Sequence, residues 1–284
     1  MTDRIATIGF FDGVHKGHTF LFEHLQALAS ERGLTPLIVT FAQHPRAVLE
    51  ADYVPQLISS PEERVKQLSR YGEVVVLPFE EVQPLTAQTF MERLRDEYHV
   101  TTLLMGYDHR FGSDRLKRPQ DYRRIGEQCG VEVLTMNEYV EGEWHVSSTE
   151  IRTALENGNV ALANELLGHP YTLFGRVVHG KAIGRTLGFP TANIAPLDAH
   201  KIIPKSGVYA ALVSTPTIDD APAFVNIDKQ GLIEVHIPSF RGDLYDQVLK
   251  IRFTRFLREE KQFDSLEDLR EQIKADIDNN LRQA

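Results

Sequence analysis

The spacing of apolar residues changes once along this chain of 284 residues, and that change constrains its fold more than any other feature. Up to about residue 140, short apolar runs of strand type alternate with stretches of helical spacing. This alternation is typical of βαβ units, which form a parallel sheet with helices on both faces. After about residue 170 the apolar residues recur at every second position, a period that indicates antiparallel strands.

The first part of the chain predicts strands at Ile5–Phe10, Leu37–Phe41, Val74–Leu77 (a buried strand), Thr102–Met105 and Val131–Thr135. The helices expected between them are Gly17–Arg32, a helix opened by the capping box Ser60-Pro61-Glu62-Glu63 and ended by Gly72, Phe90–Tyr98 and Gln120–Cys129. Ligands of such sheets bind outside the carboxyl ends of the strands, so the residues that follow the strands are candidates for a site.

The second part predicts strands at Gly207–Ser214, Ala223–Ile227, Leu232–Ile237 and Val248–Phe253. A terminal helix over Ser265–Leu281 opens with Ser265 and has Asp268 three residues further on. Between the two parts, Glu150–Leu167 has helical spacing and is followed by Gly168, a common helix end. We therefore expect an α/β domain with a parallel sheet, followed by a small antiparallel β-barrel or sandwich with one terminal helix.

Charge is distributed unevenly between these two parts. Residues 1–168 carry the whole formal net charge of −9, with 16 Lys and Arg against 25 Asp and Glu, whereas residues 169–284 hold 15 of each. This step in charge supports two domains, 1–168 and 169–284. The acidic balance argues against a nucleic-acid partner.

Composition narrows the class of protein further. Charged residues make up 25% of the chain and hydrophobic residues 42%, as in ordinary globular proteins. Because no apolar run approaches the roughly 18 residues of a membrane span and no apolar targeting segment opens the sequence, we expect a cytoplasmic protein without a membrane partner. Cys129 is the only cysteine, which excludes an internal disulfide and a thiolate zinc site. Homo-oligomerisation stays open.

The first candidate site is the segment Gly9-Phe10-Phe11-Asp12-Gly13-Val14-His15-Lys16-Gly17-His18, where the first strand turns into the first helix. The free N–H groups and partial positive charge of a helix start favour phosphate, and His15 and His18 lie on one face of its first turn. Gly17 removes a side chain where phosphate would approach, and imidazoles can donate hydrogen bonds to a transferring nucleotidyl group. Two solvated histidines and a metal pair are the alternatives, although no further metal ligand stands at a suitable spacing.

A second candidate, Val146-Ser147-Ser148-Thr149-Glu150-Ile151-Arg152, follows the last strand of the first part. Hydroxyls such as those of Ser147 and Ser148 can cap the next helix, and Arg152 can pair bidentately with phosphate. Alone, this segment predicts only a good N-cap. Combined with the histidine turn of the same sheet, it predicts a second phosphate clamp.

A third candidate is Gly184-Arg185-Thr186-Leu187-Gly188-Phe189-Pro190-Thr191-Ala192-Asn193. Gly184 and Gly188 flank a rigid turn at Pro190. The Thr191 hydroxyl and the Asn193 carbonyl that end it are hard oxygen ligands, of the kind that Mg²⁺ takes together with phosphates and water. A purely structural hairpin is the alternative.

Together these segments resemble the bacterial bifunctional riboflavin kinase/FMN adenylyltransferases, the FAD synthetase family. The likeness covers nearly the whole chain in the right order. It also includes Thr40-Phe41 with His44-Pro45-Arg46, Gly106-Tyr107-Asp108-His109-Arg110-Phe111-Gly112, Glu234-Val235-His236, Asp243-Leu244-Tyr245 and the segment from Leu257 to Phe263. Each motif is modest alone, but their joint order is highly specific. The resemblance implies a Rossmann-like nucleotidyltransferase domain followed by a riboflavin kinase-like barrel.

The resemblance also implies two reactions that use small-molecule substrates and Mg²⁺. The barrel would transfer the γ-phosphate of ATP to riboflavin, which gives FMN. The N-terminal domain would transfer AMP from a second ATP to FMN, which gives FAD and pyrophosphate. Both transfers depend mainly on positioning and charge neutralisation.

By resemblance, the N-terminal site residues are His15 and His18 at the ATP phosphates, Gly9, Phe10, Asp12 and Gly13 in the same turn, Ser147, Ser148 and Arg152 in the second clamp, and Asp108 at the nucleotide and flavin site. Phe41 could stack on the flavin or belong to the core. The barrel residues are Thr191 and Asn193 at magnesium and phosphate, Gly184, Gly188 and Pro190 in the same segment, and Arg258 near the flavin. Glu234 matches the base for the ribityl hydroxyl proton; otherwise it is an exposed strand carboxylate.

The chain departs from the family pattern at two places. Ala42-Gln43 stand where the family usually has Asp-Pro, which weakens any acidic role there. After Asn226 the chain is roughly ten residues shorter than the family pattern, near the expected kinase site. The main alternative is therefore an FMN adenylyltransferase whose barrel is a weak or inactive kinase that binds flavin or positions the first domain. A regulatory or tRNA-synthetase-like nucleotide-binding module ranks lower, because the first domain is acidic.

Overall fold

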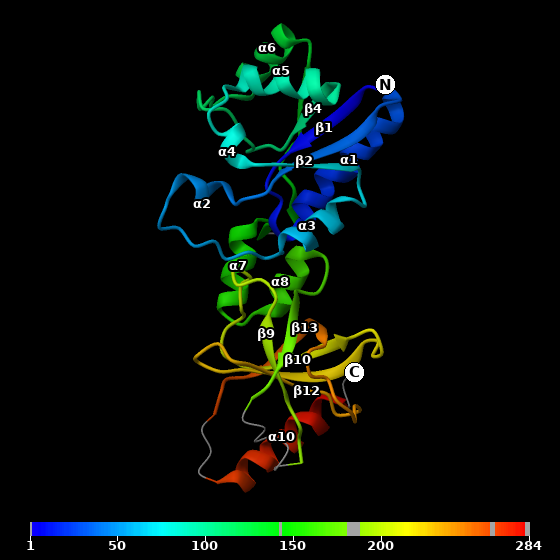
Figure 1. Cartoon of the computed structure of the whole chain (residues 1–284). Coiled ribbons are helices and arrows are strands. Elements are labelled where there is room, and N and C mark those ends of the chain that lie inside the picture. Colours follow the sequence, from blue (N-terminus) through cyan, green and yellow to red (C-terminus); the bar gives the residue numbers. More distant parts are fainter. Residues whose placement is uncertain (1, 142–143, 181–187, 262–264, 282–284) are drawn as a thin grey trace. The chain divides into compact units, whose positions relative to one another are not determined.

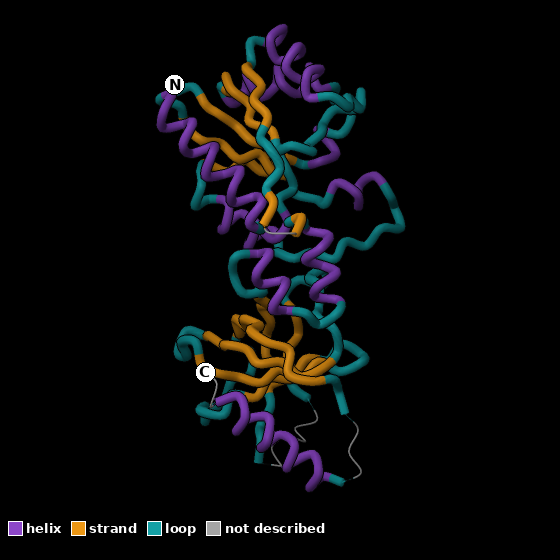
Figure 2. Tube along the Cα trace, turned by 180° about the vertical axis from the view of Figure 1, so that it is seen from behind, coloured by secondary structure: helices purple, strands orange, loops and turns teal. Residues whose placement is uncertain are grey.

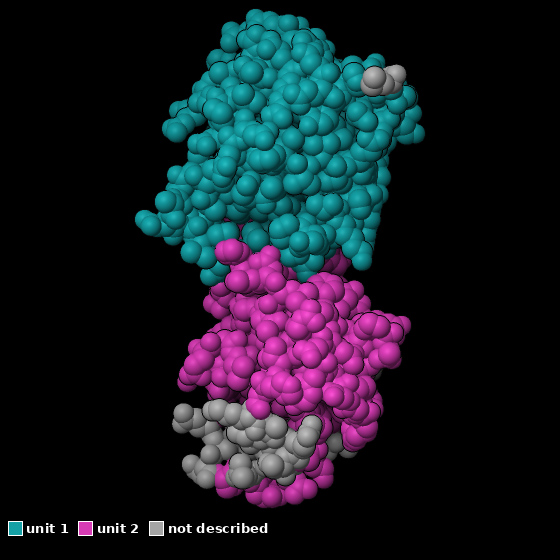
Figure 3. All heavy atoms as spheres, viewed as in Figure 1, with its two compact units in different colours: residues 1–148 teal, residues 149–284 magenta. Residues whose placement is uncertain are grey.

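The computed structural model describes residues 2–141, 144–180, 188–261 and 265–281 (Figure 1). The chain divides into two compact units, Met1–Ser148 and Thr149–Ala284 (Figure 3). This division falls before residue 168, where the sequence pattern placed the domain boundary, because the helical segment that precedes residue 168 packs on the barrel. No helix in the described ranges is long and apolar enough to cross a membrane.

The first unit is built on a five-stranded parallel sheet, as the sequence predicted. Its strands are β1 (Arg4–Ile8), β2 (Thr35–Phe41), β3 (Glu73–Leu77), β4 (Val100–Met105) and β5 (Glu132–Thr135). Their order is β3-β2-β1-β4-β5, and each neighbouring pair is parallel. The carboxyl ends of all five strands therefore lie at one edge of the sheet.

Helices cover both faces of this sheet (Figure 2). One face packs on α1 (Lys16–Arg32) and α3 (Pro61–Leu68), and the other on α4 (Phe79–Val82), α5 (Ala87–Tyr98) and α6 (Pro119–Cys129). Successive residues of β1 point to opposite faces, so Ile5 joins the first core cluster and Ala6 the second. The shorter elements are a 3₁₀ turn at Asp12–Val14, α2 (Pro45–Leu49), and a hairpin of β6 (Val140–Glu141) and β7 (Trp144–His145).

Two local predictions in this unit were wrong. Val74–Leu77 was expected to be buried, but β3 is an edge strand in which only Leu77 is buried. Gly72 was expected to end the capping-box helix, which instead ends at Leu68. Glycine is needed at position 72 for another reason, because a Cβ there would lie 2.6 Å from the Pro36 carbonyl oxygen. The capping box of Ser60 and Glu63 is formed as predicted.

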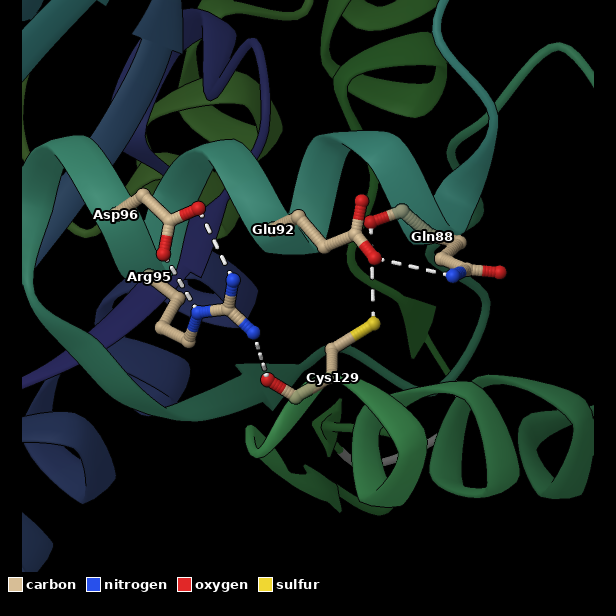
Figure 4. A network of polar contacts seen from close by, with 5 residues as sticks. All are labelled: Gln88, Glu92, Arg95, Asp96 and Cys129. Atoms are coloured by element: carbon tan, nitrogen blue, oxygen red, sulfur yellow. Dashed lines mark hydrogen bonds and ion pairs between the residues drawn. The ribbon is translucent and has the colours of Figure 1, made fainter.

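Cys129 is a buried structural residue at the end of α6 (Figure 4). Its Sγ donates weakly to the Gln88 carbonyl at 3.9 Å, and its own carbonyl accepts from Arg95 at 2.6 Å. Burial raises the pKa of the Cys129 thiol, which keeps it protonated and unreactive. These contacts join α6 to α5.

The second unit contains a closed antiparallel barrel. Its strands are β8 (Thr172–Val178), β9 (Ala192–Pro196), β10 (Gly207–Ser214), β11 (Ala221–Ile227), β12 (Ile233–His236) and β13 (Val248–Arg258), in the order β10-β11-β12-β9-β8-β13. The barrel and four of its strands were expected. The sequence patterns did not identify β8 or β9, and Asn193 lies within β9 instead of ending a hairpin turn.

In the part of the second unit that the structure describes, three helices accompany the barrel: α7 (Ser148–Glu156), α8 (Val160–Leu167) and α10 (Leu266–Leu281). The expected stretch Glu150–Leu167 is two helices, broken at Gly158 with φ of 78°. The Asn164 side chain on α8 donates to the Phe253 carbonyl at 2.9 Å and accepts from Tyr171 N at 2.7 Å. These contacts attach α8 to the barrel, so this segment belongs to the second unit.

Candidate functional site

The histidine turn follows β1 at the carboxyl edge of the parallel sheet. Phe11, Gly13 and Val14 take positive φ values of 56°, 78° and 44°. Only glycine adopts this region without cost, and a β-branched residue there is an outlier of the kind found at functional sites. The chain thereby reverses tightly, and α1 begins at Lys16 with His15 as its N-cap.

The imidazole rings of His15 and His18 are stacked, with centroids 3.6 Å apart and planes inclined by 19°. Nδ1 of His15 accepts from the backbone N–H of His18 at 3.4 Å, which orients the first ring. Burial, and secondarily the charge of His15, lower the pKa of His18 well below its ordinary value. His18 is therefore neutral at neutral pH, and its buried Nδ1 has no hydrogen-bond partner in the structure.

Hydrogen bonds to the Asp12 side chain fix the position of the turn. Its buried carboxylate accepts from Ile58 N at 3.0 Å and from Ser59 N at 2.9 Å, and the Ser59 hydroxyl donates to it at 3.1 Å. The backbone N–H of Gly13 in turn donates to the Ser59 hydroxyl at 2.9 Å. The Asp12 side chain thus ties the turn to the segment before α3.

Ser148, one residue of the second predicted clamp, contacts the histidine turn. The Ser148 hydroxyl donates to the Asp12 carbonyl at 3.1 Å. A Cβ at Gly17 would lie 3.2 Å from the His15 ring and 3.4 Å from the Val146 carbonyl oxygen. Glycine at position 17 therefore lets this segment approach the imidazole. Ser147 precedes Ser148 and is half-buried, whereas Arg152 lies on α7 in the second unit.

Several buried polar side-chain atoms of the first unit have no hydrogen-bond partner among the described residues. In addition to His18 Nδ1, they include Nε and Nη1 of Arg64 and Nε2 of His109. His109 lies in the loop after β4, and burial lowers its pKa to about 4. Because buried polar groups are normally satisfied, each of these exceptions needs an explanation, and a bound ligand is one.

The other predicted residues of this edge have different surroundings. Gly9 lies under the Phe11 ring, which a Cβ at position 9 would strike at 2.6 Å. Phe10 packs edge-on against His44. Phe41 is 6% exposed and packs edge-on against Phe79 in the core, which favours the core role that the sequence left open for it. Asp108 is exposed in the loop after β4.

The predicted barrel residues form a row across three strands. Asn193 on β9 is the direct neighbour of Glu234 on β12, which in turn faces Asn226 on β11. The Thr191 hydroxyl lies 3.5 Å from Glu234 Oε1. Ile233 and Val235 point into the barrel core, so Glu234 and its neighbours in the row lie on the outer face.

The surroundings of Glu234 make it more basic than an ordinary glutamate. Burial raises its pKa, and the nearby Asp228 carboxylate adds to the rise, while hydrogen bonds from Thr191 and Asn226 oppose it. Asn193 is buried, and a Cβ at Gly180 would overlap its amide. The side chains of Thr191, Asn193 and Glu234 thus form a set of oxygen donors that suits Mg²⁺.

A cavity of about 260 Å³ opens beside this row. Pro190, Thr191 and Ala192 line one side of it, and Val177, Val235, Ile237 and the residues from Phe240 to Tyr245 line the rest. The Nδ1–H of His236 donates a hydrogen bond to the Pro190 carbonyl at 2.8 Å and so anchors this wall. Gly188 has a φ of 84° just before it, and Gly184 lies outside the described residues.

Arg258 has a structural partner. Its Nε donates to Oδ2 of Asp276 at 2.9 Å, and both side chains are largely buried. This ion pair attaches α10 to the end of β13. The guanidinium that the family resemblance assigns to the flavin is therefore engaged by α10.

Two family models cover most of the chain: the FAD synthetase model matches residues 1–150 and the riboflavin kinase model residues 167–283. The bifunctional riboflavin kinase/FMN adenylyltransferases of Escherichia coli K12 and Bacillus subtilis 168 are each 35% identical to it. These matches cover 96% and 98% of this chain and 90% and 92% of the relatives. The chain belongs to this bifunctional family.

A solved structure described as a macrolide-efflux protein from Streptococcus pneumoniae has the same fold. It is 33% identical, with a TM-score of 0.89 over 98% of this chain and 93% of its own. Its description differs from the activities named for the curated relatives. The family models and the curated relatives agree with each other on both activities.

The segment in which this chain departs from the family pattern is a closed turn. Oδ1 of Asp228 accepts from the backbone N–H groups of Gln230 and Leu232 at 2.9 and 2.8 Å, and Gly231 takes a φ of 83°. β11 and β12 are thus joined by a tight hairpin, and Glu234 keeps its place opposite Asn226.

Sequence reasoning did not single out Arg64, Asn226 or His236, which contact or neighbour predicted residues in the structure. Arg64 occupies a helix position where arginine is usually exposed. The other two become neighbours of the predicted residues only through strand register and a loop contact. The alternation Ile233, Glu234, Val235 was the one local signal that placed Glu234 on a defined face.

Proposed function

We propose that this chain makes FAD from riboflavin in two ATP-dependent steps. The barrel phosphorylates riboflavin to FMN, and the parallel-sheet domain adenylylates FMN to FAD with release of pyrophosphate. One observation carries the proposal: each unit holds its own group of polar side chains with the chemistry that its step needs. We assign adenylyl transfer to residues up to about 168 and phosphoryl transfer to the residues after it.

In the adenylyl-transfer site, His15 and His18 bind the ATP phosphates at the start of α1. The neutral His18 ring can donate one hydrogen bond to a phosphate oxygen, and the helix N-terminus adds a positive potential. Ser147, Ser148 and Arg152 complete the second clamp, and Gly9, Phe10, Asp12, Gly13 and Asp108 shape the nucleotide and flavin site. The FMN phosphate oxygen attacks the α-phosphorus of ATP, and pyrophosphate leaves.

In the kinase site, the Glu234 carboxylate accepts the proton of the ribityl hydroxyl as that oxygen attacks the γ-phosphorus and ADP leaves. Thr191 and Asn193 hold Mg²⁺, which neutralises phosphate charge when it is bound. Pro190 lies in the wall of the neighbouring cavity, which takes the nucleotide or the flavin, and Gly188 lies just before that wall. Gly184 belongs to the same segment, and Arg258 supports this region through α10.

The closed turn at Asp228 favours a second candidate function, in which the barrel is a weak or inactive kinase that binds flavin. The family pattern has a longer segment there, and losing a cover of this kind commonly reduces binding and rate together. In either case we place the protein in the cytoplasm.

Chromatography of the products formed from riboflavin, ATP and Mg²⁺ over time tests both functions. The bifunctional proposal expects FMN to appear first and FAD to follow. FAD formation from added FMN without any turnover of riboflavin would establish the second candidate instead. An absence of product from both flavins would contradict the whole assignment.

A further inference from the structure

Arg64 on α3 is completely buried in the first unit, with 0% of its side chain exposed. The capping box at the start of α3 fixes the helix from which it projects. Burial lowers the pKa of its guanidinium to about 10, so it keeps its charge at neutral pH. A fully buried cation is unusual and normally has a carboxylate partner.

The guanidinium lies across the carboxyl ends of two neighbouring strands. Nη2 donates to the carbonyl of Phe41, the last residue of β2, at 2.7 Å. The guanidinium carbon stands 3.9 Å from the centroid of the Phe10 ring, which follows β1 in the histidine turn. The Thr40 hydroxyl donates to the Phe10 carbonyl at 3.1 Å and joins the same two strand ends. Arg64 therefore contacts the turn that leads to His15.

The charge of Arg64 is not matched by a close partner within the described residues. Nε and Nη1 are buried without a hydrogen-bond partner. Asp12 and Glu62 act on it only through their charges, and the Asp12 carboxylate is occupied by the Ile58 and Ser59 donors. Leaving a buried charge unpaired is costly, and such groups persist where they serve a function. The substrates proposed above are polyanions, and a buried cation without a directly bonded carboxylate would attract them.

We propose that Arg64 is a positioning residue of the adenylyl-transfer site, whose buried charge favours the phosphates of ATP and pyrophosphate at the histidine turn. It acts through the Phe10 ring and the Phe41 carbonyl, which hold it beside the turn. In a low-dielectric surrounding its field is weakly screened, so it strengthens anion binding without direct contact. This inference rests on the proposed adenylyltransferase function.

The test uses the full chain with Arg64→Met, which keeps an unbranched apolar stem but removes the charge, and Arg64→Lys, which keeps the charge. Arg70→Met, at an exposed position just after α3, is the matched control. Titration calorimetry measures pyrophosphate binding, and steady-state assays give kcat and KM for ATP in FAD formation. We expect Arg64→Met to weaken pyrophosphate binding and raise KM at least tenfold, with kcat within threefold. Arg64→Lys and the control should stay within threefold of the wild type.

Two results would overturn the inference. One is pyrophosphate affinity within threefold of the wild type in folded Arg64→Met. The other is a loss in folded Arg64→Lys as large as that in Arg64→Met, which would show that guanidinium geometry and not charge is needed. If Arg64→Met does not fold, as circular dichroism would show, Arg64→Gln replaces it as the variant without the charge, and the same two limits apply to it. A wild type that forms no FAD from FMN would refute the proposed function and not this inference. Pyrophosphate binding by that wild type can still be compared with binding by Arg64→Met, so failure of the function and failure of the inference are distinguishable.

Discussion

Glu234 and Asn193 are direct neighbours on adjacent antiparallel strands, β12 and β9, so their side chains lie on the same outer face of the barrel. Thr191 precedes Asn193 by two residues, and its hydroxyl lies 3.5 Å from the Glu234 carboxylate. A carboxylate with a raised pKa thus stands beside two oxygen donors that suit Mg²⁺. This pairing joins the proposed base of the kinase to the proposed metal ligands.

Replacing Glu234 by glutamine should abolish FMN formation and leave FAD formation intact. The amide keeps the shape of the side chain but cannot accept the ribityl proton, a role worth about 10²–10⁴-fold in rate. Riboflavin phosphorylation and FMN adenylylation are measured on the same preparation, with exposed Glu271→Gln on α10 as control. Normal phosphorylation by Glu234→Gln would place the base elsewhere. In the wild type, the rate should begin to fall at a higher pH than an ordinary glutamate would give, because the pKa of Glu234 is raised.

Replacing Asn193 by alanine should reduce riboflavin phosphorylation by more than tenfold, equivalent to about 1.4 kcal/mol of transition-state stabilisation. The change removes an oxygen ligand from the proposed Mg²⁺ site. The rate should also need more Mg²⁺ to reach half its maximum. Asn157→Ala, at an exposed position after α7, serves as control. An unchanged rate at limiting Mg²⁺ would mean that Asn193 serves only the barrel structure.

Replacing both His15 and His18 by alanine should reduce FAD formation from FMN by at least about a hundredfold. The two stacked rings are the proposed hydrogen-bond donors to phosphate in the turn. Replacing both removes the possibility that one ring substitutes for the other. His24→Ala, at an exposed position on the same helix, should leave the rate unchanged. Riboflavin kinase activity of the double variant shows whether the barrel is intact. Full FAD formation by the double variant would refute the assignment.

Much of this fold could be predicted because its information is local. Strands and helices of the first unit follow from apolar period, and the Ser60 capping box formed as expected. β9 could not be found this way, because Ala192–Pro196 is short and follows a proline turn, and its extended form depends on pairing with β8 and β12. The exposure of β3 likewise depends on its place at the sheet edge, which a short apolar run does not reveal.

The features of the candidate sites also differ in whether local sequence could predict them. The His15 and His18 turn was predictable because a strand, glycines and a helix start are contiguous in sequence. The hydrogen bond from Ser148 to the Asp12 carbonyl joins segments far apart in the chain. Local sequence patterns could suggest that the two segments belong to one site, but they could not predict this contact. Arg64 was not predictable, since nothing in the pattern of α3 distinguishes a buried arginine from an exposed one.

Replacing Asp12 by alanine should lower the free energy of unfolding by about 2–5 kcal/mol, because it leaves the buried Ile58 and Ser59 N–H groups without an acceptor. Urea denaturation followed by circular dichroism measures the loss. Asp52→Ala, at an exposed position, should change the free energy by less than about 0.5 kcal/mol. Equal stabilities of the two variants would show that the Asp12 carboxylate does not hold the turn.

The stability of the protein should depend on pH through His109, whose pKa burial lowers to about 4 from an ordinary value of 6.5. The unfolded chain then binds a proton at a higher pH than the folded chain does. The contribution of His109 is therefore fully present above pH 6.5 and is lost as the pH falls from 6.5 through about 4, by about 3 kcal/mol in total. Asp108 opposes this shift only in part.

His109→Phe keeps an aromatic ring that does not titrate, so its urea midpoint should fall less than that of the wild type between pH 7 and pH 4. His18 and the carboxylates titrate in both proteins and cancel in the difference between them. Parallel curves for the two proteins over this range would mean that the imidazole of His109 is solvated in the native state.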